Sequence, residues 1–368
     1  MGTRYLAPVA CVLLALAAPG LVAGSGSFGG GALAVQAAGS WTATASMTSL
    51  RSSPTATRLV DGRVLVVGGE GDTSRASTAE LYDSSTGTWS PAGTLNEPRT
   101  LHVAVRLADG RVLVAGGGWY GAGAELYDPA TNRWTPTGSM NVGRISFTGT
   151  LLADGRVLVV GGNSLSGLQA SAELYDPAIG RWTTTASLRL PRRNHTATRL
   201  ADGSVLVAGG ASTGKTVRPR DAEVYDPARG RWSRGGTMTT GREGATATLL
   251  GNGRVLVAGG DFSGTSAELY DPGSRSWRAT GSMSSPHGVT GALLQDGRVL
   301  AAGGGAGDVY SPASGTWTAT GPMVYPYASA AAALLPSGQV LYAGGRRVRY
   351  CGQYSCDEPL ADAALYTP

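Results

Sequence analysis

Apolar and polar residues alternate in a regular cycle along most of the chain. In one cycle, small and β-branched residues at 54–60 are followed by an Asp-Gly pair at 61–62 and by the apolar run "RVLVV" at 63–67. A polar stretch, the segment "AELYD" at 79–83 and then Trp89 complete the cycle. Apolar runs this short, bounded by Gly, Asp and Pro, predict β-strands and not helices. We therefore expect four strands per cycle, with a tight hairpin at the Asp-Gly pair.

The cycle occurs seven times. Its most regular part is the second strand with its preceding turn and its double glycine, and the copies are spaced 41 to 50 residues apart. They stand at 61–69, 109–117, 154–162, 202–210, 252–260, 296–304 and 337–345. Six copies are followed by a tyrosine and then a tryptophan, whereas the seventh stops at "AALYTP" (363–368). A period of this length with four strands per unit predicts a β-propeller.

The split seventh unit predicts how the ring closes. The missing tryptophan has a counterpart near the other end of the chain, as Trp41 in "GSWTATASM" (39–47). A strand around Trp41 would complete the blade that ends at Tyr366, and this pairing would remove two exposed sheet edges. We therefore predict one all-β domain over 38–368, a seven-bladed β-propeller with four-stranded blades.

The repeated residues resemble those of the kelch-repeat family. The resemblance rests on the double glycine after an apolar strand, the tyrosine of "AELYDP" and the tryptophan that follows, and it covers 40–368. It implies a kelch-type propeller similar to the central domain of galactose oxidase. Members of this family mostly bind proteins or carbohydrates, and a few carry enzymes. The fold alone therefore does not assign a function.

The double glycines do not predict a nucleotide site. A dinucleotide-binding loop needs glycines that open a helix, whose N-terminus then holds the phosphate. After Gly69 comes "EGDTSRAST", which has no helical period, and no copy matches a phosphate-binding loop. We expect close backbone approach and positive φ at these glycines instead. A second turn position, just before the tryptophan, holds glycine or asparagine in five units but Arg275 in the fifth, where we expect a strained turn.

Residues 1–37 differ from the rest of the chain. Arg4 is their only charge, 5–23 are almost wholly apolar, and small residues follow. This pattern predicts a secretory signal peptide that is cleaved after Ala37 or after Ala23, with an uncleaved N-terminal anchor as the alternative. No other segment reaches the roughly 18–20 apolar residues that span a bilayer. We expect an exported monomer that is secreted or held at the cell surface.

Signal removal leaves two cysteines, Cys351 and Cys356. In an oxidising compartment this short spacing predicts a local disulfide. A metal site is not expected there, since no histidine or second cysteine pair lies nearby in the sequence. The net charge of +5 is small for 368 residues and does not predict a nucleic-acid partner. No cofactor is expected.

The expected topology separates two faces of the propeller. The 1–2 and 3–4 turns, which are short and repetitive, share one face, whereas the 2–3 loops and the 4–1 links between blades share the other. We call the first the short-turn face and the second the loop-rich face. Because the 2–3 loops vary in length and sequence, we predict that the loop-rich face carries the function.

Candidate ligand-binding residues on the loop-rich face form a ring of cations at the 4–1 links. The arginines are Arg51, Arg99, Arg144, Arg192 and Arg242, and the sixth and seventh units offer His287 and Tyr327. Arginines around one mouth could hold a carboxylate, a sulfate or an acidic peptide. A matching acidic series in strand 3 favours the alternative, a repeated structural ion pair; it consists of Glu80, Glu125, Glu173, Glu223, Glu268 and Asp308.

Two further sets of residues are candidates for a functional site. His102 and His195 share one repeat position, where we expect a packing role, and the three histidines lie too far apart in blade order for a metal site. The adjacent Trp119 and Tyr120 break the repeat in a 2–3 loop. They could stack on a sugar or fill a partner's pocket, or they could fold over the blade.

The sequence thus favours a secreted binding protein without enzymatic activity, which recognises a protein or a glycan. The alternative is a carbohydrate-active enzyme. The family resemblance implies two such activities, a sialic-acid mutarotase and, less favoured, a copper-radical sugar oxidase. The second needs a Tyr–Cys cross-link, a second Tyr and two His, whereas the mature cysteines here are confined to one loop.

Overall fold

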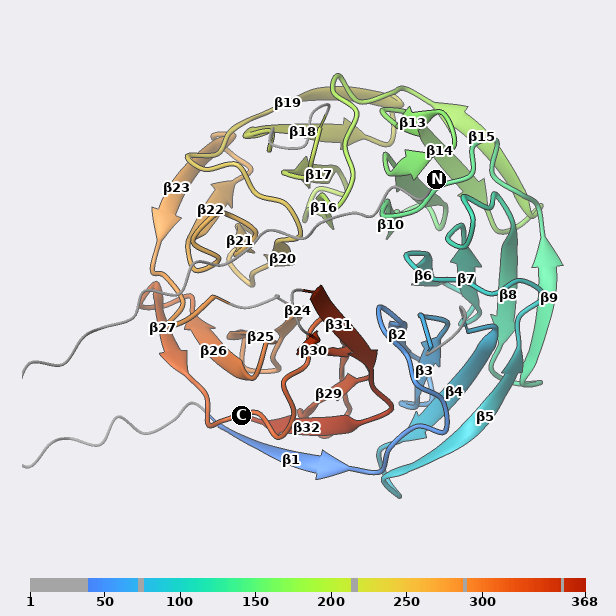
Figure 1. The fold of residues 1–368 in the computed structure, drawn as a ribbon. Coiled ribbons are helices and arrows are strands. Elements are labelled where there is room, and N and C mark those ends of the chain that lie inside the picture. Colours follow the sequence, from blue (N-terminus) through green and yellow to red (C-terminus); the bar gives the residue numbers. More distant parts are fainter. Residues whose placement is uncertain (1–38, 72–75, 213–217, 287–289, 352–353) are drawn as a thin grey trace, which may run out of the picture. The chain divides into compact units, whose positions relative to one another are not determined.

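The structure is a computed structural model that describes residues 39–71, 76–212, 218–286, 290–351 and 354–368. Contacts divide the chain into Met1–Gln36 and Ala37–Pro368, and all described residues belong to the second unit. This unit is all-β. Its strands form seven four-stranded sheets arranged around a ring (Figure 1). The described residues include no helix that is long and apolar enough to cross a membrane.

Each blade contributes one strand to each of four positions, counted from the inside outward. The innermost strands are β2 (Thr55–Arg58), β6 (Val103–Arg106), β10 (Thr148–Leu151), β16 (Thr196–Arg199), β20 (Thr246–Leu249), β24 (Thr290–Leu293) and β28 (Ala331–Leu334). The second strands are β3 (Val64–Val67), β7 (Val112–Ala115), β11 (Val157–Val160), β17 (Val205–Ala208), β21 (Val255–Ala258), β25 (Val299–Gly303) and β29 (Val340–Ala343). The third strands are β4 (Thr78–Asp83), β8 (Ala124–Asp128), β14 (Ala172–Asp176), β18 (Asp221–Asp226), β22 (Ala267–Asp271), β26 (Ala306–Ser311) and β32 (Ala363–Thr367). The outer strands are β5 (Thr88–Thr94), β9 (Arg133–Thr137), β15 (Arg181–Thr185), β19 (Arg231–Thr237), β23 (Ser276–Thr280), β27 (Thr316–Ala319) and β1 (Ser40–Thr44).

The predicted seven-bladed propeller and its closure are confirmed. Strand β1 pairs antiparallel with β32, and Trp41 lies opposite Tyr366 in the register. Their ring centroids are 5.1 Å apart. Each innermost strand contacts those of its two neighbouring blades, including β2 with β28. The seventh blade is therefore assembled from both ends of the propeller sequence.

The hydrophobic core lies between the blades. Every residue of the second strands is buried, because each of these strands has a strand on both sides and a neighbouring blade on both faces. In one core cluster, Leu65 and Val67 of the first blade pack with Val112 and Val114 of the second. In each blade the tyrosine of strand 3 also packs against the tryptophan of strand 4, with ring centroids 4.9–5.1 Å apart.

The turns follow the sequence prediction. Gly62 of the first Asp-Gly pair has φ 92°, the conformation that a tight hairpin requires. At the turn position before the tryptophan, Arg275 has φ 52°, so the fifth blade holds a non-glycine residue in the left-handed region. Two 2–3 loops carry hairpins of their own, β12 (Asn163–Ser164) with β13 (Gly167–Leu168) and β30 (Arg346–Cys351) with β31 (Tyr354–Pro359).

Candidate functional site

The five predicted arginines lie buried at the base of the loop-rich face. Their exposed fraction is 0–2%. Each forms an ion pair with the acidic residue of strand 3 in its own blade, at 2.9–3.1 Å: Arg51–Glu80, Arg99–Glu125, Arg144–Glu173, Arg192–Glu223 and Arg242–Glu268. Burial lowers the pKa of Arg51, Arg144 and Arg192, and the paired glutamate opposes that shift. The repeated ion pair that the acidic series suggested is therefore present in five blades.

Each of these arginines also holds backbone. In Arg144, Nη1 donates to the carbonyl of Gly161 at 2.8 Å and to that of Ser171 at 2.9 Å. Gly161 is the first glycine of its pair, so the guanidinium secures the start of the variable loop. The partner Glu173 accepts from the backbone N–H groups of Asn141 and Val142 in the 4–1 link. Because these donors are engaged inside the protein, the charged groups of the arginine ring contact other protein atoms and not solvent.

The sixth and seventh blades depart from this pattern. Tyr327 stands at the arginine position of the seventh blade and is fully buried, and its hydroxyl has no hydrogen-bond partner among the described residues. Burial raises its pKa. Ala364 occupies the position of the glutamate, so both members of the ion pair are replaced together. In the sixth blade Asp308 is buried and accepts from Ser284, whereas the candidate His287 lies outside the described residues.

His102 and His195 are buried links between blades. Their exposed fractions are 7% and 6%. The Nε2 atom of each ring lies 2.9 Å from a threonine hydroxyl on the preceding blade's inner strand, Thr55 for His102 and Thr148 for His195. Burial, reinforced by the nearby arginine, lowers the pKa of both rings from 6.5 to about 3. These rings are neutral at physiological pH, and their surroundings fit a packing role.

The aromatic pair is split between solvent and scaffold. Trp119 is 83% exposed. Tyr120 is half-buried, has φ 61°, and its hydroxyl accepts from Asn163 Nδ2 of β12 at 3.3 Å. The N–H of Gly121 donates to the carbonyl of Gly117 at 3.0 Å and closes a tight turn. Tyr120 therefore anchors the turn on the next blade, while Trp119 extends from it.

Two more exposed side chains on this face were missed by the sequence analysis. Leu165 lies between β12 and β13 and is 84% exposed, and Phe262 lies in the 2–3 loop of the fifth blade and is 86% exposed. Both stand a few residues after a double glycine, in "GGNSLSG" and "GGDFSG". A bulky apolar residue isolated among Gly and Ser in a variable loop is the sequence signal for such an exposed side chain. The sequence analysis used this signal only at "GGGWYG".

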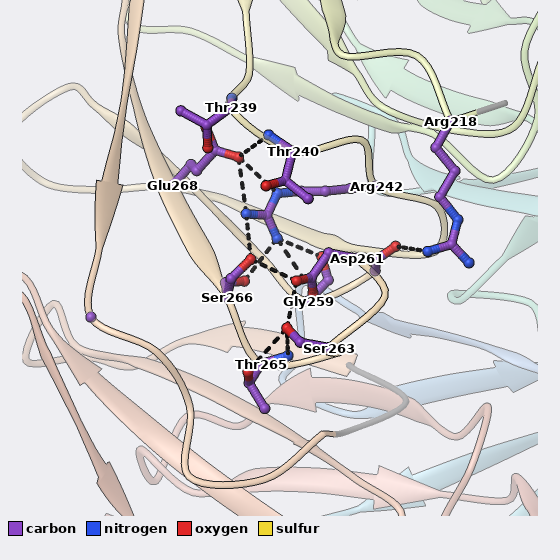
Figure 2. A network of polar contacts seen from close by, with 12 residues as sticks. Arg218, Thr239, Thr240, Arg242, Gly259, Asp261, Ser263, Thr265, Ser266 and Glu268 are labelled. Carbon is purple, nitrogen blue, oxygen red and sulfur yellow. Dashed lines mark hydrogen bonds and ion pairs between the residues drawn. The ribbon is translucent and has the colours of Figure 1, made fainter. Parts of the chain in front are cut away.

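The residues on either side of Phe262, Asp261 and Ser263, belong to a network of polar contacts that also includes Arg242 (Figure 2). The guanidinium carbon of Arg218 lies 4.5 Å from the centroid of the Phe262 ring, and Arg218 also donates to the carbonyl of Gly260 at 3.2 Å. Next to Phe262, Asp261 accepts from Ser263 and Ser266 at 2.5 and 2.8 Å. These contacts tie the loop to Arg242 and leave the phenylalanine ring projecting from a fixed base.

The predicted disulfide stays a prediction. The register of β30 and β31 places Cys351 opposite Tyr354 and Cys356 opposite Arg349. The two cysteines are therefore diagonal and not directly opposite. Their side chains lie outside the described part of the structure.

Hollows large enough for a ligand occur on the short-turn face. One has a volume of about 870 Å³ and is lined by turns of the third, fourth and fifth blades. Another of about 550 Å³ lies against the turns of the fourth and fifth blades. The variable loops and the hollows of the short-turn face are thus on opposite sides of the ring.

A catalytic metal site is not assembled by the described side chains. Among them, no three His, Cys, Asp or Glu side chains are grouped so as to hold an ion. His102 and His195 belong to the second and fourth blades, and each is engaged by a threonine. These two histidines are therefore not placed together to bind one ion.

Comparison with known proteins supports the fold. A family model described as "Kelch motif" matches residues 51–96. A solved structure titled "Novel fungal alcohol oxidase with catalytic diversity among the AA5 family, in complex with copper" is similar with a TM-score of 0.73 and 21% identity. The match covers 90% of this chain and 76% of that one. At this identity the likeness concerns the fold. Among curated proteins, none matches significantly.

Proposed function

We propose that this chain, a seven-bladed β-propeller with a kelch motif, is a non-enzymatic recognition protein. Its loop-rich face binds a protein or a glycan outside the cytoplasm, and it acts as a monomer. The observation that carries the proposal is the exposure of three large apolar side chains on variable loops, Trp119, Leu165 and Phe262, at 83–86%. Exposed apolar side chains of this size favour burial against a partner.

The loops that carry these side chains are held in place, which supports recognition over loose association. Tyr120 fixes the turn of Trp119 through Asn163, and Arg218 packs on Phe262. Side chains already held in position lose less conformational entropy on binding, so less of the interaction free energy is spent on ordering the loop. A binding face made from several rigid loops also suits the kelch-type scaffold.

Substitution of the three exposed side chains tests the proposal. We expect Trp119→Ala, Leu165→Ala and Phe262→Ala, combined in one variant, to abolish binding that the unmodified protein shows to a defined glycan array or to whole cells. Folding should be unaffected because none of the three is in the core. Val60 and Ile179, 77% and 64% exposed on the short-turn face, provide the matched control. Binding that survives the triple variant, or is lost equally in Val60→Ala/Ile179→Ala, contradicts this assignment.

Export is part of the proposal and has its own test. N-terminal sequencing of the protein recovered from the medium or cell surface should begin at Ala38 or at Gly24, the residues after the two candidate cleavage positions. Recovery of the intact N-terminus in the cytoplasm would contradict export. The same sample, analysed by mass spectrometry without reduction, reports whether Cys351 and Cys356 are joined.

Enzymatic activity is the second candidate, since an oxidase shares the fold. The mutarotase alternative needs an acidic or basic group for proton transfer and an arginine for the sugar carboxylate. The arginines of the ring are 0–2% exposed and paired, so none of them is open to such a substrate. Sialic-acid anomer exchange followed by NMR is a direct assay, and a rate above background would favour the enzyme.

A further inference from the structure

The positive charge of this protein is concentrated in two blades. Residues 186–280, which form the fourth and fifth blades with their links, contain fourteen Lys and Arg against eight Asp and Glu. The remaining residues contain sixteen Lys and Arg against seventeen Asp and Glu. The net charge of +5 therefore comes from these two blades. Although the overall charge is small, cationic side chains are in local excess here.

Part of this charge lines the hollow of about 870 Å³ on the short-turn face, where Arg156 of the neighbouring third blade adds a further cation. The lining includes Arg156, Arg229, Arg231 and Arg275, which come from three successive blades. The blades lie side by side in Figure 1, where β15, β19 and β23 mark their outer edges. Cations of three blades converge here although Arg156 and Arg275 are far apart in the sequence.

The arginines of this hollow differ from the ring on the opposite face because they are open to solvent. Arg229 pairs with Asp226 at 2.7 Å, yet its side chain is 78% exposed. Arg231 and Arg275 are also exposed. Arg156 pairs with Asp154 at 2.7 Å with a third of its side chain exposed. The guanidinium groups can therefore accept an anion without breaking a buried ion pair.

Arg275 adds a second, independent observation. It occupies the turn position at which Gly87, Gly180, Gly230 and Gly315 stand in other blades, and its φ of 52° is unfavourable for a residue with a side chain. Its guanidinium reaches across the blade boundary and donates to Ser233 Oγ and the carbonyl of Arg234, both at 3.2 Å. An arginine is thus held at the edge of the hollow at a cost in backbone strain, which is typical of functional positions.

We propose that this hollow binds an acidic saccharide, a sugar chain that carries carboxylate or sulfate groups. Exposed arginines bind such groups with paired N–H donors. The carboxylates of Asp154, Asp202 and Asp226 line the same hollow and can accept hydrogen bonds from sugar hydroxyl groups. Trp232 supplies an apolar wall against which the sugar ring can pack. This site is independent of the loop-rich face.

Two substitutions drawn from the repeat itself test the site. Arg275→Gly introduces the residue of four other blades, and Arg231→Ser introduces the residue that Ser276 provides in the fifth blade. Binding would be measured calorimetrically in physiological salt with oligogalacturonate as the carboxylate probe and dextran sulfate as the sulfate probe. We expect each substitution to weaken binding of at least one probe about tenfold, and the pair to weaken it further. Comparing the affinities for the two probes shows whether the site prefers carboxylate or sulfate groups.

The controls separate a site from general charge attraction. Arg133→Thr removes an exposed arginine at the repeat position of Arg231 but two blades away, and Thr88 and Thr316 stand there in other blades. It should change affinity less than twofold, and so should Trp119→Ala on the opposite face. The proposal is overturned if neither probe binds, if Arg133→Thr acts like Arg231→Ser, or if a single-stranded oligonucleotide binds as tightly as both saccharides. Neutral dextran should not bind.

Discussion

The backbone N–H of Gly69 donates a hydrogen bond of 2.8 Å to the carbonyl oxygen of Arg99 on the next blade. The guanidinium of Arg51, in turn, donates to the carbonyl of Gly68 at 2.9 Å. Each arginine therefore holds its own double glycine with its side chain and the preceding double glycine with its backbone. The corresponding links run from Gly117 to Arg144, Gly162 to Arg192, Gly210 to Arg242 and Gly345 to Arg51, at 2.7–2.8 Å.

This pattern gives the arginines and glycines a joint structural role. The link from Gly345 to Arg51 connects the seventh blade to the first, so the pattern also crosses the point of ring closure. In the first four blades the variable loop leaves directly after a glycine pair that is anchored in both ways. The loops can therefore vary in sequence while their starting points stay fixed.

Breaking one ion pair should destabilise the whole propeller. Arg144→Ala would leave the carboxylate of Glu173 buried without its cation, and we expect a loss of about 3–5 kcal/mol in the free energy of unfolding. The double variant Arg144→Tyr/Glu173→Ala copies the combination of Tyr327 and Ala364 in the seventh blade, so it should lose less than the single variant. Chemical denaturation measures both. A double variant less stable than Arg144→Ala would contradict the view that the uncompensated charge causes the loss.

In five blades the first glycine of the pair is required by close backbone approach, at Gly68, Gly116, Gly161, Gly209 and Gly344. A methyl group at Gly161, where φ is 65°, would collide with the carbonyl oxygen of Arg192 and with the ring of His195. Gly155 also has positive φ, 87°, but a methyl group there meets no atom within 4 Å. We expect Gly155→Ala to cost about 1–2 kcal/mol from backbone conformation alone, and Gly161→Ala to cost about 1–3 kcal/mol more. Equal thermal midpoints for the two variants would refute the crowding argument.

The buried histidines should make stability depend on pH. In the unfolded chain histidine binds a proton below pH 6.5, whereas His102 and His195 in the fold do so only at a pKa of about 3. Unfolding therefore takes up protons between these values, so stability is lost as the pH falls below 6.5. The slope is about 1.4 kcal/mol per pH unit for each histidine.

Substitution of both histidines by phenylalanine, the residue that Phe147 provides at this position in the third blade, should flatten that slope. The measurement is denaturant unfolding between pH 7.5 and 5.0, which lies mostly above the titration of carboxylates. An unchanged slope in His102→Phe/His195→Phe would show that other groups cause the acid sensitivity.

Ring closure should depend on Trp41. Its indole packs against Tyr342 and Tyr366, both at 5.1 Å, and Nε1 donates to Thr320 Oγ1 at 3.0 Å. Trp41→Ala should cost about 3–5 kcal/mol. It should also raise hydrogen exchange along β1 and β32, because β32 is the one described strand that pairs with β1. The matched variant Trp277→Ala lies in a blade built from consecutive strands, where its Nε1 donates to the carbonyl of Gly235 at 2.9 Å, and it should leave exchange in β1 unchanged.

The number of blades, the strand order within them and the closing role of Trp41 could be derived from the sequence alone. The number of blades and their strand order rest on antiparallel pairing between strands that are adjacent in the chain, and every repeat encodes this pairing. The closing role of Trp41 follows from the repeat count, because the seventh unit lacks the tryptophan strand that the N-terminal segment supplies. The positive φ of Arg275 was likewise predictable, since its neighbours in the repeat are glycine and asparagine. Because the pattern is repeated, the local backbone geometry could be predicted from the sequence.

The roles of the charged residues could not be derived in the same way. The sequence is compatible with two roles for the arginines at the 4–1 links, a ligand-binding ring and structural ion pairs. Their burial between packed elements shows that they form ion pairs with Glu80 and its counterparts. Whether Trp119, Leu165 and Phe262 are exposed was undetermined for the same reason. Burial depends on what the neighbouring blade places against a residue.

The sequence by itself established the scaffold, because strand periodicity and turn chemistry act over a few residues. The assignment of surfaces required the assembled ring. Arg156, Arg231 and Arg275 line one hollow only because successive blades pack side by side and bring residues from different repeats together. Contacts of that kind arise between blades, where the residues that meet are separated by roughly one repeat or more, and no periodic pattern within a repeat specifies them.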